Sequence, residues 1–314
     1  MAQLTRSRPP QASPVTLTDD QIDAFWRDGV ICVRGLYSPE WVALLTKALD
    51  EICAAPSPIT GMPREGTFHS DVFTWFTNDD VRDFVLEGPS AALMQQVLRS
   101  ERINYFYDQI FVKEQMSPNP TPWHHDFTFW PLEGDQIASV WTSVDAVNAE
   151  SSALEFVVGS HRWPHRYRAI GADGLDFTTG SKMDELPDIN ADRSKFDIVS
   201  WELEPGDVLV FHALTLHGAR GNRSASTKRR AITTRWCGDD VVYAPKGMPM
   251  PYDTGLAPGD SLSGRIFPRL LPTVAEEDLA DRMRGPVLPD PAVMPALIAQ
   301  LMKADRVPVP LDTM

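Results

Sequence analysis

Few cysteines, no long apolar run and no excess of basic residues limit what this 314-residue chain can be. Its three cysteines, Cys32, Cys53 and Cys237, lie far apart and form no CxxC pair, so the sequence indicates neither a zinc knuckle nor a disulfide framework. No apolar segment is long enough to cross a bilayer, and residues 1–14 carry no hydrophobic region of a signal peptide. We therefore expect a cytoplasmic protein with reduced thiols.

Basic residues are outnumbered by acidic ones, which gives a formal net charge of −14 and a sequence pI near 4.9. Nucleic acids and anionic membranes are bound through basic surfaces, so this charge disfavours both as partners. The hydrophobic content of 43% is enough to build one large folded domain. A small-molecule partner is the remaining expectation.

The segment Trp123-His124-His125-Asp126 places two kinds of metal-binding side chain close together. Neighbouring side chains of a strand point to opposite faces, so His124 and Asp126 share a face while His125 points away. A second imidazole would complete a set of two histidines and one carboxylate, which leaves coordination positions open and is diagnostic of non-haem Fe(II) oxygenases. A His-x-Asp pattern alone often arises by chance, so this interpretation needs a second histidine in a suitable context.

His217 has such a context. A Pro-Gly-Asp turn at 205–207 and the apolar run 208–211 precede it, and they predict a turn followed by a buried strand. The separation of 93 residues between His124 and His217 is too long for a zinc-finger loop or a helical HExxH site. It suits ligands that the closure of a sheet brings together. A zinc hydrolase with the same three ligands stays open at this point.

The segment 228–236 alternates like a strand, which places on one face Arg229, Ala231, Thr233 and Arg235. Burying a guanidinium is costly unless it is paired, and its planar fork matches a carboxylate. Arg229 on an inward face therefore predicts a bound dicarboxylate. The alternative is a basic hairpin face in water, because further basic residues lie nearby, namely Arg220, Arg223, Lys228 and Arg230.

Together these residues resemble the phytanoyl-CoA dioxygenase family of Fe(II)/2-oxoglutarate-dependent oxygenases, over roughly residues 18–237 and in consistent order. The resemblance implies a mainly β fold with flanking helices. Its core would be a double-stranded β-helix, a cupin-like jelly roll with the metal in the mouth between two antiparallel sheets. The matching motifs are Trp123-His124-His125-Asp126, Gly159-Ser160-His161-Arg162, Gly206-Asp207 with Phe211-His212, His217-Gly218 with Asn222-Arg223-Ser224, and Arg229-Arg230-Ala231.

The same resemblance implies roles for individual residues. His124, Asp126 and His217 would be the ligands of Fe(II), and Arg229 would pair with the distal carboxylate of 2-oxoglutarate. Trp141, on a strand expected over 138–147, matches a tryptophan of the cosubstrate pocket, with an ordinary core aromatic as the alternative. Lys113, on a strand expected over 104–113, is a further candidate for cosubstrate contact, with a solvated edge lysine as the alternative.

The implied reaction consumes O2 and 2-oxoglutarate, releases succinate and CO2, and hydroxylates a small organic substrate such as a natural product, terpenoid, amino-acid derivative or acyl compound. Asp126 occupies the position that halogenating relatives leave vacant for halide, so hydroxylation is favoured over halogenation, while desaturation and ring formation stay open. A non-catalytic protein of the same fold that binds a small molecule or a metal is the alternative of another class. The acidic charge mildly disfavours a CoA thioester, and the oligomeric state is left open, with a homodimer as one option.

The chain departs from the family pattern at two places. Relatives often carry Asn-Gly ahead of a Pro-Gly-Ser-His motif, whereas this chain has Glu150-Ser151-Ser152 and then Val158 before the glycine, which changes a turn and leaves the ligands in place. The family's common glutamine in the first motif is His125 here. Its outward position predicts a supporting or surface role.

Residues near the metal motif and in the following loop are candidates for substrate contact. An apolar wall is typical of ligand sites, with core packing as the alternative, and the candidates for it are Phe127, Phe129 and Trp130. Two histidines four residues apart would suit a helical metal pair, but Pro164 between them breaks a helix. We therefore place at the substrate mouth His161, Arg162 and His165.

The expected organisation is one oxygenase domain over 18–285, with a disordered tail at 1–17 and a C-terminal tail at 286–314. Thr18 to Gln21 has the form of a capping box and begins a helix that Gly29 ends, and Pro39 begins a second helix. The long interval 163–200 predicts a lid over the substrate mouth, with a surface insertion as the alternative. A short helix is expected over 273–285.

Overall fold

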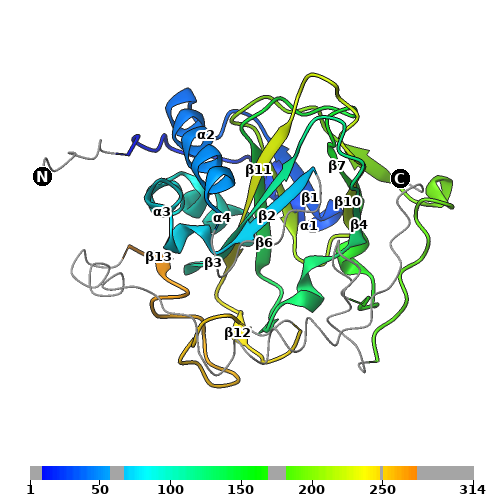
Figure 1. Ribbon diagram of the computed structural model, residues 1–314. Helices are drawn as coiled ribbons and strands as arrows, with labels where there is room; N and C mark the ends of the chain where they lie inside the picture. The colour runs from blue at the N-terminus through cyan, green and yellow to red at the C-terminus, as the bar shows by residue number, and fades with distance from the viewer. Residues whose placement is uncertain (1–8, 57–66, 169–181, 248–249, 274–314) are drawn as a thin grey trace, which may run out of the picture.

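The computed structural model describes residues 9–56, 67–168, 182–247 and 250–273. Two antiparallel sheets face each other, and α2, α3 and α4 cover the side of the larger sheet that faces away from the smaller one (Figure 1). This is the double-stranded β-helix, or jelly roll, that the family resemblance implied. The helices are α1 (Asp19–Asp28), α2 (Pro39–Ala54), α3 (Asp79–Leu86) and α4 (Ser90–Leu98).

The larger sheet has the strand order β1-β9-β6-β11-β3-β13, with β2 also paired to β3. Its strands are β1 (Val30–Val33), β2 (Phe68–Val72), β3 (Ile103–Lys113), β6 (Ile137–Ser143), β9 (Val208–His212), β11 (Arg229–Cys237) and β13 (Arg269–Leu271). The smaller sheet has the order β4-β10-β7-β8, and a separate pair joins β12 to β5. Those strands are β4 (Thr121–His124), β5 (Leu132–Glu133), β7 (Leu154–Val157), β8 (Ile198–Ser200), β10 (His217–Ala219) and β12 (Val242–Tyr243).

The hydrophobic core lies on both sides of the larger sheet. Between this sheet and the helices, Trp41, Phe84 and Trp236 are among the buried side chains of the largest cluster. Between the two sheets, Trp141 and Phe156 belong to a second cluster. Because both faces of this sheet are covered, every residue of β6 and β9 is buried, and neither strand has an exposed face.

The local signals at the N-terminal helices are confirmed. Thr18 caps α1 with the reciprocal pair of hydrogen bonds to Gln21 that defines a capping box, and Gly29 ends the helix in the left-handed conformation with φ 85°. Pro39 occupies the first turn of α2 as expected. The expected strands over 104–113 and 208–211 correspond to β3 and β9, whereas the one over 138–147 ends earlier, at Ser143.

The predicted disordered tail at 1–17 is wrong at its end. The Leu17 N–H donates to the Gln96 side chain on α4, and that side chain donates back to the Val15 carbonyl. The Leu17 side chain is buried in the core. The chain is therefore docked on α4 before its first helix begins.

Three other predicted segments fall wholly or partly outside the described residues. The helix expected over 273–285 and the tail at 286–314 lie beyond Thr273, the last residue described. Of the interval 163–200, residues 163–168 and 182–200 are described, and they include β8, which extends the smaller sheet. A part of the predicted lid is thus the edge strand of the smaller sheet.

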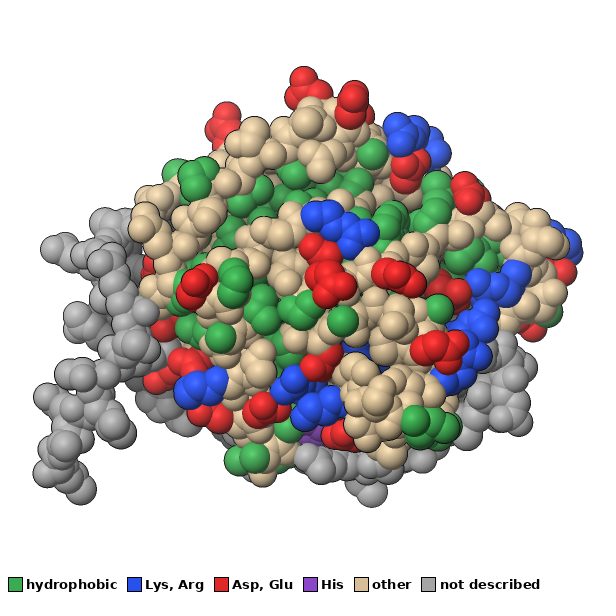
Figure 2. All heavy atoms as spheres, turned by 90° about the horizontal axis from the view of Figure 1, so that it is seen from above, with side chains coloured by type: hydrophobic (Ala, Val, Ile, Leu, Met, Phe, Trp, Pro, Cys, Tyr) green, Lys and Arg blue, Asp and Glu red, His purple; other side chains and the backbone are tan. Residues whose placement is uncertain are grey.

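The distribution of charged side chains on the surface is consistent with the acidic composition of the sequence. On the face seen from above, basic side chains lie beside acidic ones and form no continuous basic field (Figure 2). Among the described residues no helix has both the length and the apolar character that a bilayer span requires.

The two capping residues should differ in their contribution to stability. Thr18→Ala removes a side-chain acceptor from the backbone N–H of Gln21, so we expect the free energy of unfolding to fall by about 1 kcal/mol in chemical denaturation. Ser38→Ala is the matched control, because Ser38 makes no capping hydrogen bond to α2. An equal loss in both variants would contradict this assignment of the cap.

Candidate metal and cosubstrate site

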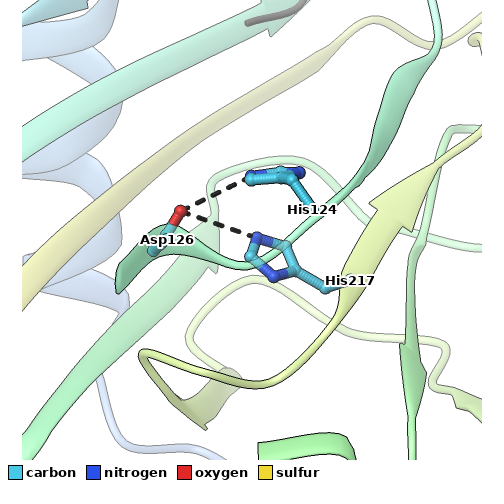
Figure 3. A group of neighbouring side chains, drawn as sticks. All are labelled: His124, Asp126 and His217. Atoms are coloured by element: carbon cyan, nitrogen blue, oxygen red, sulfur yellow. Dashed lines mark ion pairs between the residues drawn. The ribbon is translucent and has the colours of Figure 1, made fainter. Parts of the chain in front are cut away.

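His124, Asp126 and His217 converge between the two sheets. His124 ends β4, His217 begins β10, and these strands pair so that the two histidines lie opposite each other. Their ring centroids are 4.2 Å apart. One oxygen of Asp126, Oδ1, lies 3.4 Å from His124 Nε2 and 4.0 Å from His217 Nε2 (Figure 3). One donor atom from each residue falls within 4.8 Å of the others, which is the arrangement that a single metal ion requires.

His124 and Asp126 point to the same side, although they do not lie on one continuous strand as the sequence predicted. Pairing of β4 ends at His124, and Asp126 begins a short 3-10 helix, Asp126–Phe129. His125 between them is still extended, so the alternation of side chains holds for these three residues. His125 accordingly points away and accepts a hydrogen bond from the Tyr167 N–H at 3.0 Å. It is buried, so the surface role allowed for it was wrong, and a supporting role stays a prediction.

Both imidazoles are oriented by backbone carbonyls two residues earlier in the chain. His124 Nδ1 lies 2.8 Å from the Pro122 oxygen, and His217 Nδ1 lies 3.0 Å from the Thr215 oxygen. A carbonyl only accepts, so each Nδ1 carries the proton and each Nε2 keeps its lone pair. Both free lone pairs belong to the atoms nearest Asp126, as metal-binding histidines require.

The charges of the group also suit a divalent cation. Burial lowers the pKa of His217 to about 3, with His124 adding to the effect, so this imidazole is neutral near pH 7. Burial alone would raise the pKa of Asp126, but the close contact with His124 and the charge of Arg235 hold it below its usual value. A neutral imidazole and an ionised carboxylate are the protonation states in which these groups bind metal.

A second group of polar residues lies along β3 and β11 in the same interior. Lys113 and Arg229 face each other across the two strands and are essentially excluded from solvent. Lys113 Nζ donates to Ser152 Oγ at 3.1 Å and to the Arg220 carbonyl at 3.0 Å. Arg229 reaches the Ser152 carbonyl at 3.4 Å, and its Nε has no hydrogen-bond partner among the described residues. Both alternatives that placed these side chains in water are wrong.

Among the described residues, neither Lys113 nor Arg229 forms an ion pair with a carboxylate. Burial lowers the pKa of Arg229 to about 10 and that of Lys113 well below its usual value, because this interior disfavours charge. Unpaired buried charges are costly. An anion at these residues would remove that cost, as one end of a dicarboxylate would.

Trp141 packs against this group. Its ring centre lies 5.5 Å from the guanidinium carbon of Arg229, and the ring is buried on β6. A cation above an aromatic face gains about 1 kcal/mol or more when water is absent. Trp141 is thus both a core residue and a wall beside Arg229, so its two predicted roles are compatible.

The three aromatic residues after the metal motif occupy different surroundings. The Phe129 ring lies 5.9 Å from that of His124, so Phe129 borders the metal site. Phe127 is buried beneath Lys246, whose Nζ lies 4.1 Å from its ring centre. Trp130 is fully buried and donates its Nε1–H to the Tyr107 hydroxyl at 2.8 Å. Core packing therefore describes Phe127 and Trp130, and Phe129 keeps the better claim to a substrate wall.

The residues predicted at the substrate mouth make contacts elsewhere. His161 lies against the end of α1, with Nε2 at 3.1 Å from the Trp26 carbonyl, and a side chain on Gly29 would collide with it. His165 is exposed and pairs with Asp184 at 2.9 Å. Arg162 is exposed on the 3-10 turn that contains His161. Substrate contact by these residues stays a prediction that none of these contacts supports.

Sequence reasoning gave no role to Arg235, which shares the inward face of β11 with Arg229. Arg235 is buried, and its Nε lies 3.8 Å from Oδ2 of Asp126. Ser139 on β6 donates to the same oxygen at 3.2 Å. The alternation of β11 marked Arg235 as inward, but its partner lies about a hundred residues earlier, and no local pattern connects the two.

Comparison with known proteins supports this description. The sequence model of the family described as "Phytanoyl-CoA dioxygenase (PhyH)" matches residues 25–231. A probable phytanoyl-CoA dioxygenase of Caenorhabditis elegans is 26% identical over 38% of this chain and 37% of its own length. The multifunctional dioxygenase ausE of Emericella nidulans is 26% identical over 79% of this chain and 84% of its own length.

Similarity to a solved structure supports the fold independently. The non-heme alpha ketoglutarate dependent carbocyclase SnoK from nogalamycin biosynthesis superposes with a TM-score of 0.69, at 24% identity over 82% of this chain and 99% of that one. At this identity the likeness establishes the jelly-roll architecture. Since the family match covers well over half of the sequence and contains the His124–Asp126 segment, His217 and Arg229, the chain belongs to the phytanoyl-CoA dioxygenase family and is an Fe(II)/2-oxoglutarate-dependent dioxygenase.

Proposed function

We propose that this enzyme hydroxylates a small organic substrate, with Fe(II) held by His124, Asp126 and His217. The observation that carries the proposal is the convergence of these three donor groups within 4.8 Å, next to an interior that contains two unpaired cations. Two imidazoles and one carboxylate leave coordination positions open, which distinguishes an oxygenase site from a closed structural site. A zinc hydrolase would leave the buried Lys113 and Arg229 without a function.

We further propose that Arg229 and Lys113 hold the distal carboxylate of 2-oxoglutarate, with Trp141 as a wall of its pocket. The guanidinium can bind a carboxylate through two parallel hydrogen bonds, and the ammonium adds a second positive charge from the opposite strand. Ala231 and Thr233 continue the buried inward face of β11 between Arg229 and Arg235, and both have small side chains.

Bound together, Fe(II) and 2-oxoglutarate supply the oxidising power that transfers oxygen from O2 to a C–H bond, with succinate and CO2 as coproducts. The carbonyls of Pro122 and Thr215 orient the imidazoles of His124 and His217, and burial keeps His217 neutral. Phe129 beside His124 supplies an apolar surface where a substrate can lie. Exclusion of water from this interior strengthens each charged contact.

Ring formation or desaturation is the second candidate outcome of the same chemistry. Similarity to a protein described as a carbocyclase and to one described as a multifunctional dioxygenase favours it. Natural products and acyl compounds are therefore the substrate classes we put first. A cytoplasmic location is also proposed, which the free thiols of Cys32 and Cys237 support.

Loss of one ligand should abolish formation of the metal and cosubstrate complex. Under anaerobic conditions, Fe(II) plus 2-oxoglutarate should give the parent protein a weak visible charge-transfer band, and His217→Ala should remove it because Nε2 of His217 is a ligand. His125→Ala is the matched control, since the neighbouring histidine points away from the site, and its band should persist. A parent protein that binds neither Fe(II) nor 2-oxoglutarate would refute the proposal.

Replacement of the buried arginine should act on the cosubstrate alone. Arg229→Gln should weaken 2-oxoglutarate binding by about 2 kcal/mol or more, roughly 30-fold, because it removes one partner of a buried ion pair. The rise in melting temperature that 2-oxoglutarate gives the Fe(II)-loaded protein in anaerobic calorimetry should shrink accordingly.

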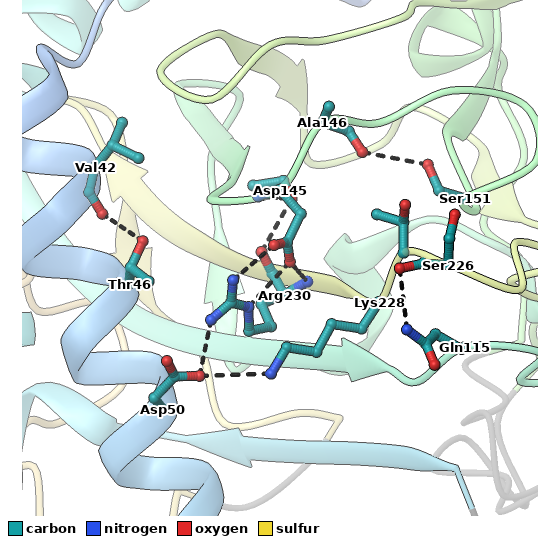
Figure 4. Close-up of polar contacts among 12 residues, drawn as sticks. Val42, Thr46, Asp50, Gln115, Asp145, Ala146, Ser151, Ser226, Lys228 and Arg230 are labelled. Atoms are coloured by element: carbon teal, nitrogen blue, oxygen red, sulfur yellow. Dashed lines mark hydrogen bonds and ion pairs between the residues drawn. The ribbon is translucent and has the colours of Figure 1, made fainter.

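The control for this prediction is the next residue of the same strand. Arg230 faces outward and pairs with Asp145 at 2.6 Å and with Asp50 of α2 at 2.8 Å (Figure 4). Arg230→Gln should lower the melting temperature of the free protein but leave the shift caused by 2-oxoglutarate intact. Equal 2-oxoglutarate affinity in Arg229→Gln and the parent would exclude the assigned role.

A further inference from the structure

The two oxygens of the Asp126 carboxylate face different partners. Oδ1 faces the two imidazoles, with Nε2 of His124 at 3.4 Å and Nε2 of His217 at 4.0 Å. Oδ2 faces the larger sheet, where Ser139 Oγ donates to it at 3.2 Å and Arg235 Nε lies at 3.8 Å. Oδ1 of the carboxylate is therefore available to a metal, while Oδ2 contacts Ser139 and Arg235 on the larger sheet.

Arg235 is itself held in a narrow range of orientations. Its guanidinium carbon lies 4.2 Å from the Tyr107 ring centre and 5.6 Å from that of Trp130, and the hydrogen bond between these two aromatic residues keeps their rings together. Arg235 Nη2 donates to Gln109 Oε1 at 3.0 Å, and Gln109 in turn donates to Ser70. Arg235 Nη1 reaches the Thr233 carbonyl at 3.4 Å, while Nε makes no hydrogen bond with the described residues and lies 3.8 Å from Oδ2 of Asp126.

These supporting residues belong to neighbouring strands of one sheet. Ser139 lies on β6, Arg235 on β11 and Gln109 on β3, which are adjacent in that order. Asp126 follows β4 of the opposite sheet and lies on a short 3-10 helix that offers little rigidity of its own. The larger sheet thus determines how a carboxylate from the smaller sheet is presented.

From this geometry we propose that Arg235 is a positioning residue that, with Ser139, holds Oδ2 of Asp126 so that the carboxylate binds the metal through Oδ1 alone. The inference rests on the proposed function, since it assumes a metal at the three ligands. A carboxylate that bound through both oxygens would fill one more coordination position. Holding Oδ2 keeps that position open for 2-oxoglutarate or O2.

Electrostatics separates this role from simple support of metal binding. A guanidinium near a divalent cation repels it, so Arg235 opposes binding of the metal by itself. The same positive charge attracts the dianionic cosubstrate. Removal of Arg235 should consequently leave metal affinity undiminished and weaken the cosubstrate, whereas general damage to the site would weaken both.

The test measures binding of Co(II), and then of 2-oxoglutarate to the Co(II)-loaded protein, by anaerobic calorimetry and visible absorption. Arg235→Gln should bind Co(II) at least as tightly as the parent, but its affinity for 2-oxoglutarate should fall about 10- to 100-fold. Its Co(II) absorption should change in intensity, because the number of ligands changes. Arg235→Lys should recover part of the 2-oxoglutarate affinity, since it restores the charge without the planar fork.

Arg230→Gln is the matched control, because it removes an ion-paired arginine from the outer face of the same strand. Its Co(II) spectrum and 2-oxoglutarate affinity should equal those of the parent. Ser139→Ala takes the place of Arg235→Gln if that variant does not fold, and it should shift both quantities in the same direction by about tenfold or less.

Three results would overturn the inference. One is a folded Arg235→Gln protein with the parental Co(II) spectrum and 2-oxoglutarate affinity. If Arg235→Gln does not fold, the corresponding result is a Ser139→Ala protein in which both properties are unchanged. Another is the same set of changes in Arg230→Gln. The third is a large loss of Co(II) affinity in Arg235→Gln, which would show that Arg235 supports metal binding itself. Failure of the parent to bind Co(II) would instead reject the proposed function, so the two failures are distinguishable.

Discussion

The antiparallel pairing of β4 with β10 is the constraint on which the site depends. Each strand is only three or four residues long, yet their register places His217 opposite His124. A slip of one residue would turn one imidazole to the opposite face of the sheet and destroy the site. The remainder of the smaller sheet supports this pairing, because β7 binds the other edge of β10 and β8 extends it.

The larger sheet contributes charge instead of ligands. Lys113, Arg229 and Arg235 are buried on its strands in a protein whose overall charge is strongly negative, and among the described residues only Asp126 lies within ion-pair distance of any of them. Such an interior is unfavourable for the protein alone, and a dianionic cosubstrate relieves it. Conflict between local stability and ligand binding is expected at functional sites, and here it is confined to one face of one sheet.

Much of the architecture could be read from local patterns, because these depend on neighbours in the sequence. Thr18 and Gly29 delimit α1 through capping bonds and a left-handed backbone, and the alternation from Arg229 onward indicated an inward arginine. Predictions failed where the environment came from distant residues. Lys113 could not be distinguished from a solvated lysine until Ser152 and Arg220 were seen to enclose it.

By itself the sequence determined which residue types were available to bind a metal and an acid, and where the chain bends and alternates. These properties depend on side-chain chemistry and on interactions between residues a few positions apart. Only the tertiary structure decided that His161 lies against α1, and that Trp130 packs beside the buried Arg235. It also decided which oxygen of Asp126 faces the imidazoles. Such choices depend on strands separated by many residues, and no local pattern encodes their distance or orientation.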